Sequence, residues 1–174
     1  EDFSKNLYGA KCCAILCSSE MAAAMGLLAC FAAEVTAVPL SMRYGKFHCN
    51  KILDTIDPDA IIMDTNGEIT VYKIKDSQYV TPSVHPALIM CTSGTTGKPK
   101  GAMLTHGNYF TAIHNECDVL TLKQDDVFLG IYPMAHVGLS WAISALRAAA
   151  YYILIEQFNM DEYLELCESE KVTV

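Results

Sequence analysis

The chain has 174 residues, a formal net charge of −8 and a hydrophobic content of 52%. This length suits one domain or part of one. The apolar content argues against a disordered chain, because it can supply a sizeable core. The acidic balance, without a basic run or basic residues interleaved with aromatic ones, argues against a nucleic-acid partner.

Eight cysteines are many for this length, and no two of them have CxxC spacing. Because the chain does not open with a signal peptide, we expect a cytoplasmic protein whose thiols are free and mostly buried. A disulfide or zinc framework is the alternative. The apolar segment 21–33 is shorter than the roughly 20 residues of a membrane span, so we expect no transmembrane segment.

The first half of the chain predicts strands that alternate with helices. Residues 12–17 are a short apolar run typical of a buried strand, and Ser18 or Ser19 can cap a helix over 21–33. That helix is apolar all round, so we expect it to be covered on more than one side. The next elements are a strand over 35–40, a surface helix over 46–56, a strand over 59–64 and a hairpin that turns at Asn66-Gly67.

The second half continues the alternation. After a polar surface loop over 75–86 we expect a buried strand over 87–91, then a brief strand and a helix over 102–117 with Thr105 as cap. A strand over 125–133 and a helix over 138–150 follow, and the helix should turn Leu139, Ile143 and Leu146 inward. The last elements are a strand over 151–156 and a helix over 160–171 capped by Asn159. This pattern predicts an α/β fold with a mostly parallel sheet flanked by helices on both faces.

The stretch TSGTTGKPKG, residues 92–101, is the strongest chemical signal in the sequence. It follows a buried strand directly, as ligand loops do in α/β folds. Glycines at 94, 97 and 101 let backbone N–H groups approach a ligand, while hydroxyls and two lysines add donors and positive charge, so the loop predicts a phosphate cradle. Its spacing does not fit a Walker A motif. The alternative is a flexible polar surface turn. The residues assigned to phosphate binding are Thr92, Ser93, Gly94, Thr95, Thr96, Gly97, Lys98 and Lys100.

The loop and its flanks resemble the adenylate-forming, or AMP-binding, enzymes. ALIMCTSGTTGKPKGAMLTHGN looks like the signature of that family, which includes acyl- and aryl-CoA synthetases, and VTAVPLSMRY and DDVFLGIYPMAHVGLSW look like two further family elements. The resemblance covers nearly the whole chain but only the first part of a family member. It implies that residues 1–174 are part of a large N-terminal domain, without the rest of that domain and the small C-terminal domain.

The resemblance implies a two-step reaction. ATP and a carboxylic acid give an acyl-adenylate and pyrophosphate, and the thiol of CoA then takes the acyl group. Mg²⁺ accompanies ATP and would lie near Thr92, while Lys98 and Lys100 would act on the phosphates as catalytic residues. Because later family elements are missing, we expect the isolated chain not to turn over. An adenylation domain that loads a carrier-protein thiol and a non-catalytic nucleotide-binding remnant are the alternatives.

His136 and Gly138, within PMAHVG, are the substrate-binding residues that the resemblance implies. No acidic residue lies between Asp126 and Glu156. A substrate amine would therefore find no counter-charge in this element, which favours a simple carboxylic acid and a role such as fatty acid metabolism. Trp141 either gates the acyl pocket or belongs to the core.

Three positions depart from the family pattern. Ala135 stands where an aromatic residue usually precedes the histidine, and this change would widen the mouth of the acyl pocket. Glu34 and Ala149 each replace a glycine. If the turn at Ala149 needs a positive φ, the substitution costs about 1 kcal/mol or more.

Overall fold

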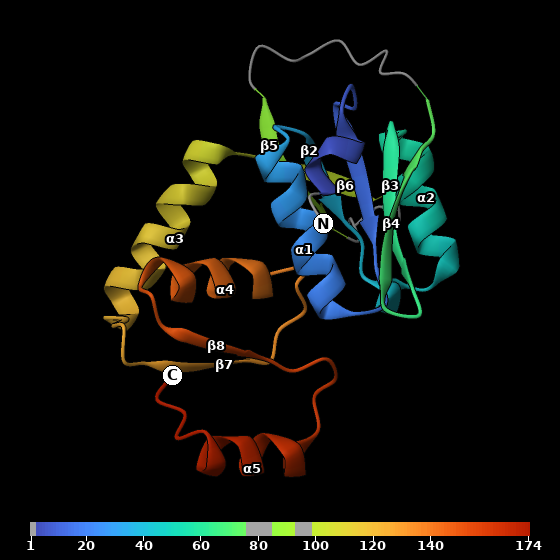
Figure 1. Ribbon diagram of the computed structural model, residues 1–174. Coiled ribbons are helices and arrows are strands. Elements are labelled where there is room, and N and C mark those ends of the chain that lie inside the picture. Colours follow the sequence, from blue (N-terminus) through green and yellow to red (C-terminus); the bar gives the residue numbers. More distant parts are fainter. Residues whose placement is uncertain (1–2, 76–84, 93–98) are drawn as a thin grey trace.

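A six-stranded sheet and a separate two-stranded sheet organise the chain, whose computed structural model describes residues 3–75, 85–92 and 99–174 (Figure 1). The larger sheet has the order β4 (Glu68–Lys73), β3 (Ala60–Thr65), β1 (Cys12–Leu16), β2 (Thr36–Pro39), β5 (Pro86–Thr92) and β6 (Lys100–Thr105). The smaller sheet pairs β7 (Val127–Gly130) with β8 (Tyr151–Leu154). The helices are α1 (Glu20–Ala32), α2 (Lys46–Ile56), α3 (His106–Leu120), α4 (Gly138–Arg147) and α5 (Met160–Ser169), with short 3-10 helices η1 (Phe3–Leu7) and η2 (Met42–Tyr44).

Most strand pairs are parallel. β3, β1, β2 and β5 pair in parallel, and only β4 and β6, at the two edges of the larger sheet, pair antiparallel with their neighbours. β7 and β8 are parallel to each other as well. The predicted α/β fold with a mostly parallel sheet is confirmed, but the sequence did not indicate that the strands would divide into two sheets.

Helices cover both faces of the larger sheet. Neighbouring residues of β1 point to opposite faces, so each face carries apolar side chains that a helix can bury. Cys13 and Ile15 pack with Leu27 of α1 in one buried cluster. Cys12 and Ala14 pack with Ile52 of α2 in a second cluster. Figure 1 shows the same arrangement, with α1 and α2 on opposite sides of the strands, and it shows α4 and α5 on either side of the smaller sheet.

Local sequence signals place the turns and helix starts correctly. Asn66 and Gly67 adopt φ values of 52° and 82° at the tip of the β3–β4 hairpin. Ser19, rather than Ser18, caps α1, where its side chain accepts a hydrogen bond from the N–H of Ala22. Thr105 caps α3 and Asn159 caps α5, as predicted.

One prediction about burial is wrong, and another holds in part. The apolar helix α1 packs on the larger sheet, and its Phe31 also contacts the rings of His106 and Tyr109 in α3. Its remaining face is open among the described residues, with Met21, Met25 and Leu28 exposed. Leu146 is also exposed, whereas Leu139 is buried as predicted. Near the end of α4, Ala145 packs against the smaller sheet and Ser144 bonds to Glu116 of α3. Because these two residues face inward, the next residue, Leu146, faces outward.

The core of the smaller sheet explains Trp141. Its ring lies 5.7 Å from the ring of Phe128, measured between centroids, and it packs on the cluster of Phe128, Ala145 and Ala150. The indole Nε1 is buried and has no hydrogen-bond partner among the described residues. These contacts favour the interpretation of Trp141 as a core residue.

All eight cysteines are free, and six of them are buried. Burial raises the pKa of the Cys12 and Cys17 thiols to about 12. The described residues hold no group of three or more histidines, cysteines or acids that could bind a metal ion. None of the helices within the described ranges combines the length and apolar character of a membrane span.

The two residues that stand where the family pattern has glycine both lie in the left-handed region of φ. Glu34, after α1, has a φ of 55°, and Ala149, after α4, has a φ of 56°. Both positions therefore require the backbone conformation that glycine adopts freely and a residue with a Cβ atom adopts at a cost. The positive φ on which the expected cost at Ala149 depends is therefore present.

Replacing the exposed Ala149 with glycine should raise the free energy of unfolding by about 1 kcal/mol, because the strain at positive φ is removed. Chemical denaturation of the wild type and of Ala149→Gly measures the change. Ala112→Gly, at an exposed position within α3, is the matched control and should lower stability by about 0.5–1 kcal/mol. A loss of stability at both positions would contradict the strain at Ala149.

Asp64, near the carboxyl end of β3, holds the segment that follows β1. Its carboxylate accepts hydrogen bonds from the N–H of Ser18 at 2.5 Å, the hydroxyl of Ser18 at 2.8 Å and the N–H of Ser19 at 3.2 Å. Burial acts to raise the pKa of Asp64, but these hydrogen bonds outweigh it and lower the pKa below the usual 3.8. The ionised form therefore stabilises the fold.

Asp64→Asn should lower the free energy of unfolding at pH 7 by about 1–2 kcal/mol, because hydrogen bonds to a charged acceptor are lost. A depressed pKa contributes stability that is present above 3.8 and is lost as the pH falls through the folded-state pKa. The difference between the two proteins should therefore shrink below this pH in urea titrations. A constant difference down to pH 2.5 would contradict this account, and Asp125→Asn, at an exposed turn, is the control.

Candidate functional site

The ends of β5 and β6 carry the base of the predicted phosphate loop. Thr92 is the last residue of β5 and lies opposite Lys100, the first residue of β6. The hydroxyl of Thr92 lies 3.5 Å from the carbonyl oxygen of Lys100, to which it donates a hydrogen bond, and both residues are exposed. Residues 93–98 lie outside the described ranges, so the assignments of Ser93, Gly94, Thr95, Thr96, Gly97 and Lys98 stay predictions.

The loop joins two antiparallel strands, which distinguishes it from a Walker A loop that leads directly into a helix. Gly101 lies within β6 and pairs with Cys91. A Cβ atom at this position would lie only 2.6 Å from Cγ2 of Ile89. Gly101 is therefore required for close packing within the sheet, whereas we had expected it to bring the backbone close to a ligand.

His136 lies in the turn between β7 and α4, and Gly138 is the first residue of α4. The N–H groups of both residues donate to the carbonyl oxygen of Pro133, at 3.0 and 3.1 Å. A Cβ atom on Gly138 would lie 2.2 Å from the carbonyl oxygen of Tyr132, so only glycine can close this turn. His136 itself is exposed. The structure thus gives Gly138 a steric role, and contact of either residue with a substrate stays a prediction.

A cavity of about 360 Å³ lies where the carboxyl ends of both sheets meet. Its walls come from the residues that follow four strands: 17–23 after β1, 40–43 after β2, Ala135 after β7 and 156–158 after β8. The register of β2 on β5, with Ala37 opposite Leu88, places the end of β5 beside the segment 40–43. Parallel α/β sheets bind ligands at this edge, so we take this cavity and the neighbouring base of the phosphate loop as the candidate site.

Two glutamates that line this cavity connect its walls. Glu156 accepts hydrogen bonds from the N–H of Glu20 at 2.6 Å, the hydroxyl of Ser19 at 2.7 Å and the N–H of Met21 at 3.2 Å, so it caps the start of α1. The side chain of Glu20 points elsewhere and accepts a hydrogen bond from the N–H of Met134 at 2.6 Å. The carboxylates therefore join α1 to both segments that leave the smaller sheet.

Charge within the cavity is mixed. Arg43, which follows β2, lines the cavity with its guanidinium, together with the carboxylates of Glu20 and Glu156. Burial raises the pKa of the Glu20 carboxyl, and the nearby charge of Glu156 adds to this effect, whereas the hydrogen bond from Met134 and the charge of Arg43 oppose it.

The sequence alone did not identify either glutamate, because each is contributed by a segment distant from the phosphate loop. The only signal was that Glu156 ends one predicted strand and that Glu20 follows another within three residues.

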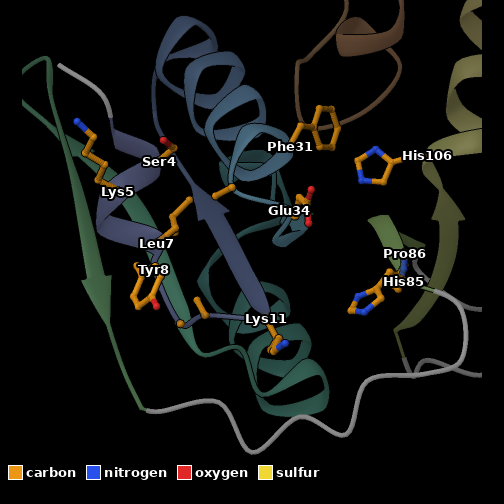
Figure 2. Close-up of a pocket in the computed structure, with 13 residues that line it drawn as sticks. Ser4, Lys5, Leu7, Tyr8, Lys11, Phe31, Glu34, His85, Pro86 and His106 are labelled. Carbon is orange, nitrogen blue, oxygen red and sulfur yellow. The ribbon is translucent and has the colours of Figure 1, made fainter.

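A larger cavity of about 1040 Å³ lies at the opposite, amino-terminal edge of the sheet (Figure 2). Figure 2 shows Tyr8, which follows η1, Phe31 near the end of α1, Glu34 just after that helix, and His85 and His106 around this cavity. Size alone favours this cavity as a binding site. We give it less weight, because the base of the phosphate loop and the turn that holds His136 lie at the other edge.

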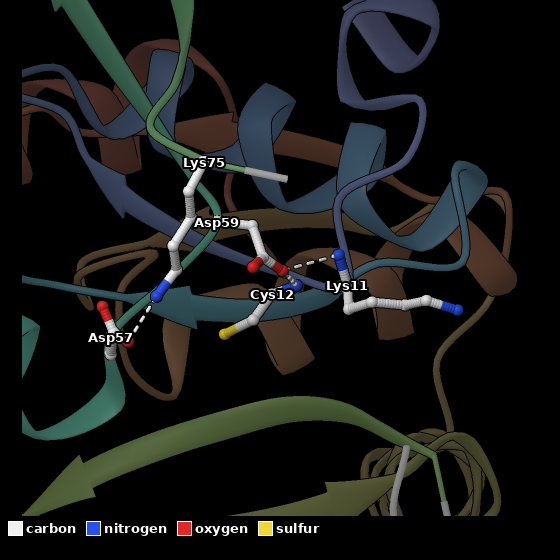
Figure 3. Close-up of polar contacts among 5 residues, drawn as sticks. All are labelled: Lys11, Cys12, Asp57, Asp59 and Lys75. Carbon is white, nitrogen blue, oxygen red and sulfur yellow. Dashed lines mark hydrogen bonds and ion pairs between the residues drawn. The ribbon is translucent and has the colours of Figure 1, made fainter. Parts of the chain in front are cut away.

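Asp59 fixes the wall of the larger cavity (Figure 3). Asp59 is only 2% exposed, and its carboxylate accepts hydrogen bonds from the N–H groups of Lys11 at 2.8 Å and Cys12 at 3.0 Å. Lys75 forms an ion pair with Asp57 next to it. Asp59 therefore holds the start of β1 against β3, which is a structural role.

Curated relatives of the chain are CoA ligases. A 4-coumarate–CoA ligase of Pinus taeda is 35% identical over 108 residues, which are 57% of this chain and 20% of that protein. An indoleacetate–CoA ligase of Aromatoleum aromaticum is 40% identical over 91 residues, which are 51% of this chain and 18% of that protein. The matched segments are thus a small part of each relative.

Solved structures share the fold. The o-succinylbenzoate CoA synthetase (MenE) of Bacillus subtilis, in complex with the acyl-adenylate intermediate OSB-AMP, has a TM-score of 0.80 at 23% identity. That match covers 100% of this chain and 51% of the MenE chain, so the chain spans about half of that structure. ATP-bound MatB of Rhodopseudomonas palustris has a TM-score of 0.77 at 20% identity and is matched over 97% of this chain and 40% of its own.

A family model decides the classification, since it matches nearly the whole chain. The model describes the AMP-binding enzyme family, and the match runs over residues 4–174. It agrees with the resemblance that the glycine-rich loop and its flanks indicated. The chain therefore belongs to the AMP-binding enzyme family.

Proposed function

We propose that the full protein activates a carboxylic acid with ATP, forming an acyl-adenylate and pyrophosphate, and then transfers the acyl group to CoA as a thioester. The observation that carries this proposal is the position of Thr92 and Lys100. They stand at the two ends of the glycine-rich loop, at the edge of the larger sheet where its parallel strands end and near which the smaller cavity lies. The curated relatives named above, which are CoA ligases, support it. So does MenE, which was solved with an acyl-adenylate and also with ATP and a magnesium ion.

The loop base suits the phosphates of ATP. Thr92 offers a hydroxyl and Lys100 a cation at facing ends of two strands, and residues 93–98 would add further donors and Lys98. An exposed hydroxyl oxygen such as that of Thr92 is also the hard ligand type that Mg²⁺ accepts. Bound Mg²⁺ would neutralise part of the phosphate charge. The chain would contribute the phosphate grip and one side of the acid site.

The smaller cavity suits the acid. Ala135 lines it, where a larger aromatic side chain would occupy part of the space. Glu20 and Glu156 line it as well, and both carboxylates already accept hydrogen bonds within the chain. The turn around His136 supplies no acidic residue as a counter-charge for an amine, so a simple carboxylic acid without an α-amine remains the proposed substrate class.

A panel of acids tests the reaction. The full-length protein is supplied with ATP, Mg²⁺ and aromatic or aliphatic carboxylic acids, with and without CoA, and both pyrophosphate and thioester are measured. At least one acid should give pyrophosphate, and thioester should appear only when CoA is present. The isolated residues 1–174 should give neither product.

The outcomes of this panel separate the alternatives. Pyrophosphate release with no thioester in the presence of CoA would favour an adenylation domain that loads a carrier protein. No release with any acid, combined with measurable ATP binding, would contradict the proposal and favour a non-catalytic nucleotide-binding protein.

Removing the lysines of the loop tests the phosphate assignment. Lys98→Ala and Lys100→Ala should each weaken ATP binding and slow adenylation by about 10- to 100-fold, because a charge-assisted hydrogen bond is worth about 1.5–3 kcal/mol. Calorimetry with ATP and acid-dependent pyrophosphate release measure the two effects. Lys123→Ala, in the turn before β7, is the control. Unchanged ATP affinity and adenylation in both loop variants would contradict the assignment.

A further inference from the structure

Two carboxylates meet at the start of α1: Glu20 belongs to the helix, and Glu156 follows β8. The helix start is bonded by Glu156 and not by its own Glu20 side chain. An acidic residue in the first turn of a helix ordinarily stabilises the free N–H groups of that turn. Here Glu156, which is 136 residues away in sequence from Glu20, accepts the hydrogen bond from the N–H of Glu20 and also binds Met21 and Ser19. The helix start is therefore satisfied without the side chain of Glu20.

The Glu20 side chain instead reaches the turn after β7. It accepts a hydrogen bond of 2.6 Å from the N–H of Met134, which is 114 residues away in sequence. Met134 is 1% exposed. Without Glu20, its N–H would be left in a buried position where water cannot easily replace the lost partner.

The turn that Glu20 holds is the one that presents His136. The hydrogen bonds from His136 and Gly138 to Pro133 lie within the turn, and those from Ser140 and Trp141 to Val137 lead into α4. They shape the turn but do not attach it to the larger sheet, on which the side chain of Met134 packs in the main buried cluster. The phosphate loop leaves from that larger sheet, after β5. The Glu20–Met134 hydrogen bond thus connects the element that carries His136 to the framework that carries the loop.

We propose that Glu20 is a positioning residue, which fixes the turn bearing Ala135 and His136 relative to the larger sheet, whose strands β5 and β6 carry the ends of the phosphate loop. This inference rests on the proposed function, in which the acid binds beside that turn and ATP binds the loop. Reacting groups on two separate elements must be held to within about an ångström, and a displacement of that size costs up to about 100-fold in rate. Glu20 acts through the turn and need not touch either substrate.

Kinetics of two Glu20 variants test the positioning role. Glu20→Ala in the full-length protein should raise KM for the acid and lower kcat/KM for acid-dependent pyrophosphate release by about 10- to 100-fold, while ATP affinity stays within about twofold. Glu20→Gln keeps a carbonyl oxygen as acceptor for Met134 and should recover most of the activity. Asp161→Ala is the matched control, because it removes an acid from the first turn of α5, far from the turn at His136.

A second measurement follows the link without any catalysis. Amide hydrogen exchange at Met134 should be faster in Glu20→Ala than in the wild type, and close to the wild type in Glu20→Gln and Asp161→Ala. Unchanged exchange at Met134 in Glu20→Ala would overturn the proposal. An equal loss of acid and ATP binding in that variant, or an effect on kinetics no larger than that of Asp161→Ala, would overturn it as well.

The two measurements separate this inference from the proposed function. If no acid supports pyrophosphate release in the wild type, the proposed function fails, and with it the catalytic meaning of the position of Glu20. The exchange rates still decide whether Glu20 holds the turn. If the wild type is active and the exchange rates do not respond to Glu20→Ala, only the positioning role fails.

Discussion

Parallel pairing of β3, β1, β2 and β5 is the constraint on which the rest of the structure depends. Each parallel pair needs a crossover connection, and both faces of such a sheet must be buried. These requirements explain why α1 and α2 lie on opposite faces. They also bring the carboxyl ends of the strands to one edge, so that Ser18, Arg43 and Thr92, far apart in sequence, leave the sheet side by side.

The smaller sheet meets this edge through polar contacts as well as through packing. Met134 and Leu139 join the main buried cluster, but the direction of the two segments that leave β7 and β8 is set by carboxylates. Glu156 replaces the missing backbone acceptors at the start of α1, and Glu20 satisfies Met134. Burial, with a smaller contribution from the charge of Glu156, raises the pKa of Glu20, so keeping this carboxylate ionised here is unfavourable. Hydrogen bonds to charged acceptors, at about 1.5–3 kcal/mol each, offset that cost.

Features that depend on a few neighbouring residues could be predicted from the sequence. Asn66-Gly67 specifies its own turn, and Thr105 and Asn159 cap helices with N–H groups two or three residues away. The contacts of Glu156 could not be predicted, because its partners on α1 are brought to it only by the tertiary fold. Leu146 follows the helical period of Leu139 and yet is exposed, since the end of α4 packs through Ser144 and Ala145. Of the candidate site, the sequence predicted a loop that follows the buried strand β5, and its phosphate-binding role stays a prediction. The two glutamates were missed, and the packing of Gly101 against Ile89 could not be read from the sequence.

The buried thiols have a consequence for how the protein meets reactive small molecules. Only the thiolate is an efficient nucleophile, and in the folded state Cys12 is enclosed within β1 and has a pKa of about 12. Alkylating and oxidising agents can therefore reach this sulfur atom only when the sheet opens. The rate at which Cys12 is modified should accordingly report how often the centre of the native chain opens.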